Sequence, residues 1–184
     1  MIAEPASETS SAWQLDPVHS LVEFSAKHLM VTTVKGRFKG VQGTIIVDGA
    51  DPARSSVEVE IDAASLDTGQ EMRDNHLRSA DFLEVDKYAT ITFRSIRIEQ
   101  LGDTHGLIFG NLTFRDVTRE VVLDAQFTGR AKSPWGTEVM AFEATTTINR
   151  KDFGLNWNVA LEAGGFLVGD TIKIEVAVEA IKQP

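Results

Sequence analysis

Apolar and polar residues alternate with a period of two along most of this chain. In residues 20–28, Val22, Phe24 and Ala26 share one phase, and most residues of the other phase are polar. This alternation is typical of a β-strand with one buried face. His28 falls in the buried phase, so we expect its side chain to point inward. The pattern returns in five further segments, whose buried phases are Gly43/Ile45/Val47, Val57/Val59/Ile61, Val121/Leu123/Ala125/Phe127, Met140/Phe142/Ala144/Thr146/Ile148 and Ile172/Ile174/Val176/Val178.

One predicted strand changes phase within its length. Ile91 and Phe93 lie in one phase, whereas Ile96 and Ile98 lie in the other. A β-bulge near Ser95 would absorb this change and let the strand turn a corner. About eight such strands predict an all-β fold, an eight-stranded antiparallel barrel, which is the size that either fills with side chains or holds one small ligand. A two-sheet sandwich is the alternative fold.

A polar stretch, residues 71–82 with the sequence EMRDNHLRSADF, interrupts the alternation. Six of its residues can ionise, and Met72, Leu77 and Phe82 are spaced among them. We predict a short helical insertion around residues 70–82 that covers an opening of the barrel. Asp74 and Arg78 stand four residues apart, in the order that favours an ion pair on a helix, so we expect them to bond to each other.

The composition narrows the classes of function. A chain of 184 residues with 42% hydrophobic and 24% charged residues suits a single globular domain. The formal net charge of −9 argues against nucleic-acid binding, which needs a basic surface. There is no cysteine, no two of the four histidines have metal-ligand spacing, and nucleophile-elbow and phosphate-loop motifs are missing. We therefore predict no metal, no cofactor and no catalytic residue.

The ends of the chain give a domain prediction. Residues 1–12 are rich in Pro, Ser, Thr and Glu, a composition typical of a disordered tail, and the folded domain is expected to cover residues 13–184. The sequence has no recognisable secretory signal and no run of about 20 apolar residues. We expect a cytoplasmic protein without a membrane span.

Four blocks of the sequence resemble the YceI-like family, which includes polyisoprenoid-binding proteins. The blocks are WQLDPVHSLVEFSAKHL with VKGRFKGVQGTI (residues 13–29 and 34–45), RDNHLRSADFLE (73–84), GNLTFRDVTREVVL (110–123), and INRKDFGLNWN with FLVGDTIKIEV (148–158 and 166–176). In order and spacing, they extend the resemblance over nearly the whole chain. The resemblance implies a lipocalin-like barrel with a helical segment, which holds an amphipathic lipid in an apolar channel.

Such a lipid has an apolar tail and a polar head, which call for different residues. Burial of the tail supplies affinity, and polar contacts with the head supply orientation and specificity. We expect the tail to contact apolar residues of the barrel interior and of the Gly-rich connection before the last strand: Val22, Phe24, Phe38, Phe93, Met140, Phe142, Phe153, Trp157 and Phe166.

Head-group candidates are basic residues. Arg73, His76 and Arg78 come first, because an arginine binds phosphate oxygens in a bidentate way and a histidine donates to an anion. His28 and Arg150 are further candidates, although a lone inward histidine is more often a hydrogen-bonded core residue, and an ion pair with Asp152 or another acid would also explain Arg150. An uncharged head such as a quinone would favour His28, Asn156 or Asn158 as donors.

The predicted function is binding, storage or transport of a polyisoprenoid, an isoprenoid quinone or a similar long-chain lipid, without catalysis. One alternative is an enzyme that acts on an isoprenoid-like substrate through His or Asp acid-base chemistry, motivated by the inward phase of His28. The other is an interaction module whose aromatic residues fill the barrel. A homodimer of two barrels stays open.

Overall fold

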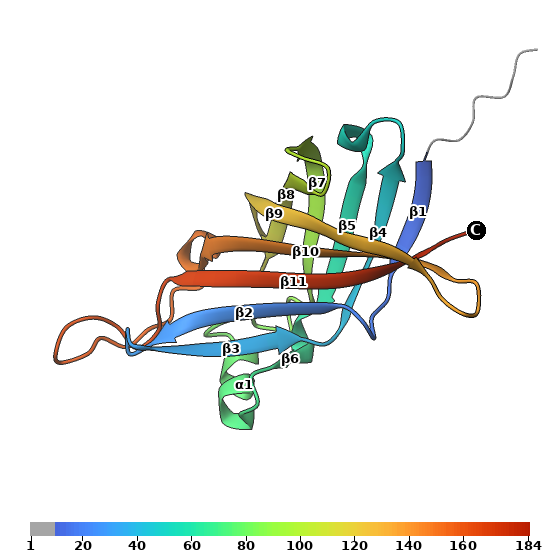
Figure 1. Ribbon diagram of the computed structural model, residues 1–184. Helices are drawn as coiled ribbons and strands as arrows, with labels where there is room; N and C mark the ends of the chain where they lie inside the picture. The colour runs from blue at the N-terminus through green and yellow to red at the C-terminus, as the bar shows by residue number, and fades with distance from the viewer. Residues whose placement is uncertain (1–9) are drawn as a thin grey trace, which may run out of the picture.

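Antiparallel β-strands make up most of the described part of the chain, residues 10–184, in a computed structural model (Figure 1). These strands are β1 (Ser10–Leu15), β2 (Leu21–His28), β3 (Thr32–Phe38), β4 (Val41–Asp48), β5 (Ser56–Asp62), β6 (Leu66–Asp67), β7 (Thr90–Gln100), β8 (His105–Phe114), β9 (Val117–Lys132), β10 (Glu138–Asn149) and β11 (Thr171–Lys182). Between them lie the α-helix α1 (Glu71–Arg78) and the 3₁₀ helices η1 (Pro52–Arg54), η2 (Ala63–Ser65) and η3 (Arg150–Phe153).

The strands close into a barrel because three long strands are bent. β1 leads into β2, β3 into β4, and β5 into β6 through short bends, so that each pair forms the two halves of one strand. β1 pairs with β4 and β2 with β3, while β4 pairs with β5 and β3 with β6. Counted in this way, residues 10–184 contain eight antiparallel strands in sequence order, and β11 closes the ring by pairing with both β1 and β2. The predicted eight-stranded barrel is confirmed, and the sandwich alternative is wrong.

The inner faces of the strands follow the predicted phases. Val57, Val59 and Ile61 of β5 line the interior, as do the alternate residues of β9, β10 and β11. The register between β7 and β8 shifts between Ser95 and Arg97, which confirms the bulge. Beyond the shift, Ile98 lines the interior and Ile96 is exposed.

The helix α1 is shorter than predicted. It begins at Glu71 and ends at Arg78, and residues 79–89 continue as turns. The side chain of Gln70 caps its first turn by accepting from the N–H of Arg73, and Glu71 and Asp74 lie near the positive end of the helix dipole. The segment fills the interval between the short strand β6 and β7, where the sheet has no strand pairing to close it.

The predicted ion pair between Asp74 and Arg78 is wrong. Asp74 accepts hydrogen bonds from the N–H and the hydroxyl of Thr68, whereas Arg78 donates to the carbonyl oxygens of Ala64 and Leu66. Both side chains therefore hold α1 against the chain that leads into it. The physical reason is that backbone groups buried under a helix need partners, and charged side chains supply strong ones.

The described fold starts before the predicted domain boundary. Ser10, Ser11 and Ala12 belong to β1 and pair with β4, so they are part of the barrel and not of a tail. Residues 1–9 of the predicted tail lie outside the described residues. No helix among residues 10–184 has the length and apolar character needed to cross a membrane.

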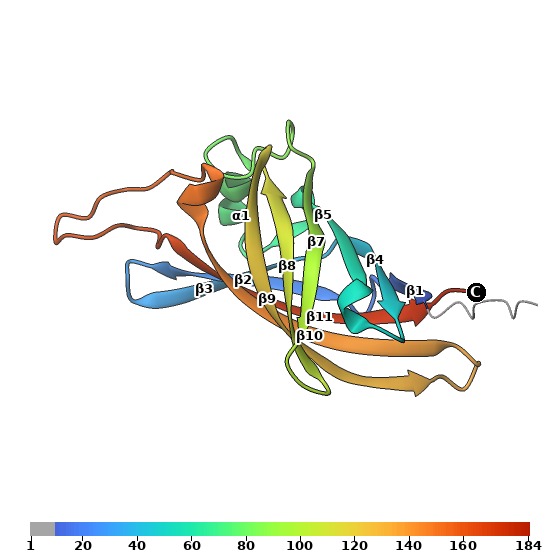
Figure 2. The same cartoon turned by 90° about the horizontal axis from the view of Figure 1, so that it is seen from above.

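Two loops project together from one end of the barrel. They are the turn between β2 and β3 and the long connection between η3 and β11, and they lie side by side in both views (Figures 1 and 2). A hydrogen bond from the N–H of Leu29 to the carbonyl oxygen of Leu167 and a β-bridge between His28 and Val168 join them. The turn between β9 and β10 projects at the opposite end (Figure 2).

Candidate functional site

A cavity of about 1100 Å³ runs through the barrel. Residues of its wall come from both ends, from Gln70 and Met72 at α1 to residues 102–106 at the β7–β8 turn. Between these ends, most of the wall is made of the inward apolar side chains of the strands. Seven of the nine residues predicted to contact a tail belong to it: Val22, Phe24, Phe38, Phe93, Met140, Phe142 and Trp157.

The structure places the other two predicted tail residues outside the cavity wall. Phe153 lies in η3, is buried, and packs its ring against Phe114. Phe166 is 46% exposed and lies on the projecting connection, where the ammonium of Lys151 is 5.7 Å from its ring. Both residues follow the last inward residue of β10, where the chain leaves the strand and the alternation of phases stops.

Two glycines keep large rings close to the wall. A side chain at Gly36 would collide with the ring of Phe24, and one at Gly110 would collide with the ring of Phe93. The aromatic rings therefore lie over backbone that carries no Cβ atom. This arrangement leaves the middle of the barrel free. If a larger residue stood under either ring, the ring would project into the middle of the barrel.

Three aromatic rings meet at the α1 end of the cavity. His76 of α1 lies edge-on to Phe82 and Trp157, with ring centroids 5.2 and 4.5 Å apart, and Phe82 and Trp157 are 5.3 Å apart. Nε2 of His76 is 2.8 Å from a carboxylate oxygen of Asp81. The cluster joins α1, the turns after it and the projecting connection, and all three rings line the cavity. We call this end the mouth.

The sequence interpretation missed Phe82 as a site residue. It belongs to the polar stretch that was expected to cover an opening, and an isolated aromatic among charged residues is the signal that would have found it. Phe82 is buried, which separates it from Met72, the exposed apolar residue of the same stretch.

Arg73 and His28 both line the mouth. Nε of Arg73 donates to the hydroxyl of Thr68 at 2.7 Å and Nη2 donates to its carbonyl oxygen at 3.0 Å. Among residues 10–184, Nη1 of Arg73 has no hydrogen-bond acceptor, so it is available to donate to an anion. His28 lines the cavity, as its phase predicts, but it is exposed at the end of β2 and is not a buried core histidine. The inner phase directs the side chain toward the cavity, and the end of the strand leaves it open to solvent.

Arg78 and Arg150 hold the chain. Arg78 lies outside the cavity wall, bound to two carbonyl oxygens as described above. Arg150 is 2% exposed, and its acid partner is Asp170 and not Asp152. All five of its N–H donors are used, with acceptors on Gly169, Leu155, Trp157, Val168 and Asp170. Burial lowers the pKa of Arg150, and the Asp170 carboxylate opposes this shift.

The two asparagines considered as donors to a quinone head also lie outside the cavity wall. Asn158 donates to the carbonyl oxygen of Val168 and accepts from its N–H, so its amide braces the projecting connection. Asn156 is exposed on that connection and lies outside the cavity wall. Neither amide is therefore placed to bind a head group at the mouth.

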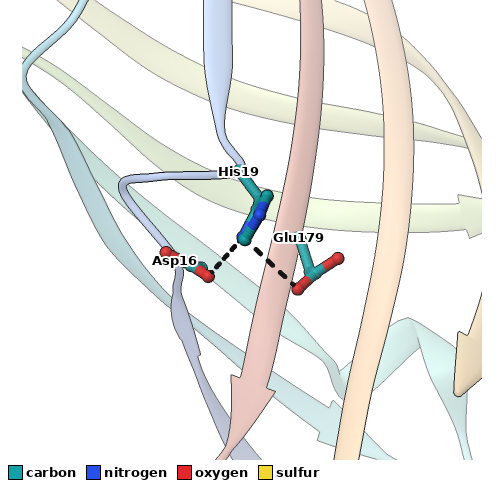
Figure 3. Close-up of side chains that lie close together, drawn as sticks. All are labelled: Asp16, His19 and Glu179. Atoms are coloured by element: carbon teal, nitrogen blue, oxygen red, sulfur yellow. Dashed lines mark hydrogen bonds and ion pairs between the residues drawn. The ribbon is translucent and has the colours of Figure 1, made fainter. Parts of the chain in front are cut away.

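One group of side chains outside the cavity has the composition of a metal site. Asp16, His19 and Glu179 point toward one another at the bend between β1 and β2 (Figure 3), with potential ligand atoms within 4.8 Å. Nδ1 of His19 is 2.7 Å from Asp16 and 3.8 Å from Glu179. The hydrogen bond to Asp16 raises the pKa of His19 and lowers that of Asp16. A protonated histidine between two carboxylates accounts for this arrangement without an ion.

Comparisons with known proteins show which family this chain resembles in sequence and in fold. The profile of the YceI-like domain matches residues 13–180. UPF0312 proteins of Ectopseudomonas mendocina and Staphylococcus aureus are each 38% identical to this chain over 165 residues, which cover 90% and 89% of this chain and 83% and 94% of theirs.

Solved structures agree with this assignment. A crystal structure of a Campylobacter jejuni YceI protein has a TM-score of 0.72 and 33% identity, and the match covers 86% of this chain and 90% of that one. BcnA of Burkholderia cenocepacia has a TM-score of 0.79 and 22% identity, with 90% and 98% covered. A polyisoprenoid binding domain from Saccharophagus degradans has a TM-score of 0.67 and 17% identity, with 94% and 99% covered. At these last two identities the likeness concerns the fold.

Proposed function

This chain belongs to the YceI-like family, and we propose that it binds an amphipathic lipid, such as a polyisoprenoid or an isoprenoid quinone, in its barrel without changing it chemically. The observation that carries the proposal is the apolar cavity of about 1100 Å³. Pockets for drug-sized ligands measure roughly 300–1,000 Å³, so this cavity suits a larger, extended molecule.

The energetics favour a long apolar tail. A buried methylene group contributes about 0.8 kcal/mol, so a tail of about 20 such groups would contribute roughly 16 kcal/mol before costs. Ordering the tail and the side chains around it takes back a large part of this free energy. The remainder is enough for tight binding, but it distinguishes poorly between tails of similar length.

Specificity then depends on the head group, which we place at the mouth. Arg73 lines the mouth with Nη1 available, and His76 lies beside it on the same helix. A phosphate or pyrophosphate head would accept from Arg73, because charge-assisted hydrogen bonds to arginine are strong and directional. Arg78 and Arg150 use their donors on the chain itself, so Arg73 is the head-group residue that we favour.

The fold neighbour from Saccharophagus degradans is described as a polyisoprenoid binding domain, which supports this class of ligand by fold alone. The observation that motivated the enzyme alternative no longer supports it, because His28 is exposed at the mouth and is not enclosed with a substrate. The ligand-free alternative requires a filled barrel, and the volume of the cavity argues against one. The cytoplasmic location and the pairing of two barrels stay predictions.

The proposal is tested by lipid uptake. Purified protein is mixed with a polyprenyl phosphate, the matching polyprenol and an isoprenoid quinone, and bound lipid is measured by native mass spectrometry together with the melting temperature. We expect at least one lipid to bind in unchanged form and to raise the melting temperature, because a ligand that binds only the folded state stabilises it. Absence of uptake of all three lipids, or recovery of a chemically altered lipid, would contradict the proposal.

A matched pair of variants tests the head-group position. Arg73→Gln should weaken binding of the polyprenyl phosphate by about 10-fold or more and leave the polyprenol nearly unaffected, since a hydrogen bond to a charged group contributes about 1.5–3 kcal/mol. Arg78→Gln is the control, because Arg78 lies outside the cavity wall. It should lower stability and keep the preference for phosphate. Loss of that preference in Arg78→Gln alone would place the head elsewhere.

A further inference from the structure

The two projecting loops expose a cluster of large apolar side chains. The β2–β3 turn carries Leu29, Met30 and Val31, and the connection before β11 carries Val159 and Phe166. Val31 is 75% exposed and Met30 is 56% exposed. Both views show the two loops at the same end, beyond the barrel (Figures 1 and 2). We call these five residues the apolar tips.

The β2–β3 turn holds residues that its backbone disfavours. Leu29 and Met30 have φ values of 52° and 60°, and the N–H of Val31 donates to the carbonyl oxygen of His28. A tight turn with positive φ at both central positions favours Asn followed by Gly. Strained residues of this kind concentrate at functional sites. The turn alone does not explain Leu and Met here, whereas a function for their side chains does.

The two tips form one ordered surface. The N–H of Leu29 bonds to the carbonyl oxygen of Leu167, and the side chain of Met30 lies against Gly165. Within the connection, Ala160 and Phe166 form a β-bridge, and Asn158 binds both backbone groups of Val168. The backbone that carries the apolar side chains is therefore held in place at the end of the molecule.

This surface is continuous with the mouth of the cavity. Lys27 and His28 precede the first tip, Leu167 and Val168 follow the second, and all four line the cavity. Trp157, a member of the aromatic cluster at the mouth, starts the same connection. A molecule that leaves the cavity at this end emerges beside the apolar tips.

The charge of the tips differs from that of the rest of the chain. Residues 27–33 and 157–168 contain one acidic residue, Glu162, in a chain with 27 Asp and Glu and a net charge of −9. Lys27 lies at the mouth, and the ammonium of Lys151, which pairs with Asp170, is 5.7 Å from the ring of Phe166. This end is therefore close to neutral and can approach an anionic lipid surface that would repel most of the remaining surface.

We propose that the apolar tips insert into the surface of a lipid bilayer, so that the ligand passes between the bilayer and the cavity without crossing water. The inference rests on the proposed function, because only a lipid ligand requires such a passage. Apolar side chains that project from a surface and are flanked by lysines suit shallow insertion at the level of the head groups. A protein partner or a second copy of this chain are the competing occupants.

The experiment measures flotation of the protein with vesicles of phosphatidylcholine, with and without phosphatidylglycerol. The variant L29N/M30G removes two apolar side chains and installs the residues that the turn favours. We expect its vesicle binding to fall about 10-fold or more, because each lost side chain forfeits buried apolar area. Its melting temperature should equal or exceed that of the unmodified protein.

Trp135→Ser is the matched control. Trp135 is 89% exposed, but it lies on the β9–β10 turn at the opposite end (Figure 2). We expect vesicle binding of this variant to stay unchanged. If Trp135→Ser abolishes flotation and L29N/M30G does not, the membrane faces the other end and the proposal is overturned.

Uptake of lipid dispersed from ethanol separates this inference from the proposed function. Uptake by this route without vesicle binding would overturn the role of the tips and leave the proposed function standing. Absence of uptake from ethanol as well would overturn the proposed function itself. Sedimentation of the unmodified protein as a dimer that dissociates in L29N/M30G, without vesicle binding, would assign the tips to a second copy of this chain.

Discussion

Single arginines in this chain have three different roles. Arg73 shares its guanidinium between Thr68 and the mouth, Arg78 fastens α1, and Arg150 fastens the connection before β11. All three looked equivalent as anion-binding candidates, because residue type determines which bonds an arginine can form but not where acceptors lie. Carbonyl oxygens brought close by folding occupy Arg78 and Arg150.

Arg150 gives a prediction at this scale. Arg150→Lys keeps the positive charge but loses the planar fork, so most of the carbonyl oxygens that Arg150 binds would be left buried without a donor. We expect a loss of about 3 kcal/mol in the free energy of unfolding, or roughly 6–12 °C in melting temperature.

Calorimetry checks this value, with Lys151→Ala as control. Lys151 is an exposed neighbour that shares Asp170, so its ion pair should contribute less than about 1 kcal/mol. A loss in Arg150→Lys no larger than that of the control would refute the anchoring role.

At the scale of elements, hydrogen bonds position α1 and the turns that follow it. α1 presents mostly polar residues and is held by Asp74 and Arg78 to the preceding chain. The turn between β8 and β9 holds the turns after α1, because its Arg115 donates to the carbonyl oxygen of Phe82 and to the carboxylate of Glu84. A polar segment can therefore cover the mouth while burying few of its own side chains.

The bend between β1 and β2 gives a pH prediction. The pKa of His19 is raised above its ordinary value of 6.5, so its contribution to stability is present below pH 6.5 and is lost as pH rises through the raised pKa. The pKa of Asp16 is lowered from 3.8, so its contribution is present above that pH and is lost as pH falls. The pair should stabilise the bend most between about pH 4 and 6.5.

The measurement compares melting temperatures of the unmodified protein and His19→Gln across pH. Their difference should be largest in that window and should shrink on either side. Asp16→Asn should remove the same pH dependence, and the double variant should add nothing further. A difference that stays constant from pH 4 to pH 9 would show that the charges of the pair do not matter.

At the scale of the whole molecule, small residues on the barrel wall help to keep the cavity open. Ala144 of β10 lies beside Ala125 of β9, and both line the cavity. Together with the glycines under Phe24 and Phe93, they keep the centre free of side chains. The same eight strands with larger residues at these positions would form a filled core.

This argument predicts the effect of filling the barrel. Ala144→Phe should reduce lipid uptake about 10-fold or more, because the added ring occupies the path of the tail, and it should not lower stability greatly, because the ring enters apolar space. Thr145→Phe is the matched control, since Thr145 is the next residue and is exposed on the outer face. Equal uptake by both variants in native mass spectrometry would mean that the tail binds elsewhere.

The period-two alternation by itself determined seven strand segments, their inner faces and the bulge near Ser95, because each depends on which side of a strand a residue occupies; β3 and β8 were not among these segments. It also indicated that residues 71–82 stand apart, since a dense run of charges cannot alternate into a core. Six of the seven predicted tail residues that line the cavity do so for the same reason, because phase directs them inward; the seventh, Trp157, lies in the connection before β11.

Only the tertiary structure decided what lies next to these faces. It leaves His28 exposed at the mouth, takes Phe153 and Phe166 away from the cavity, and supplies Arg150 with acceptors from residues 155–170. It also brings Leu29 beside Leu167, about 140 residues away in the chain. Local periodicity reports the direction of a side chain, whereas its partners depend on closure of the barrel, which joins segments that are distant in sequence.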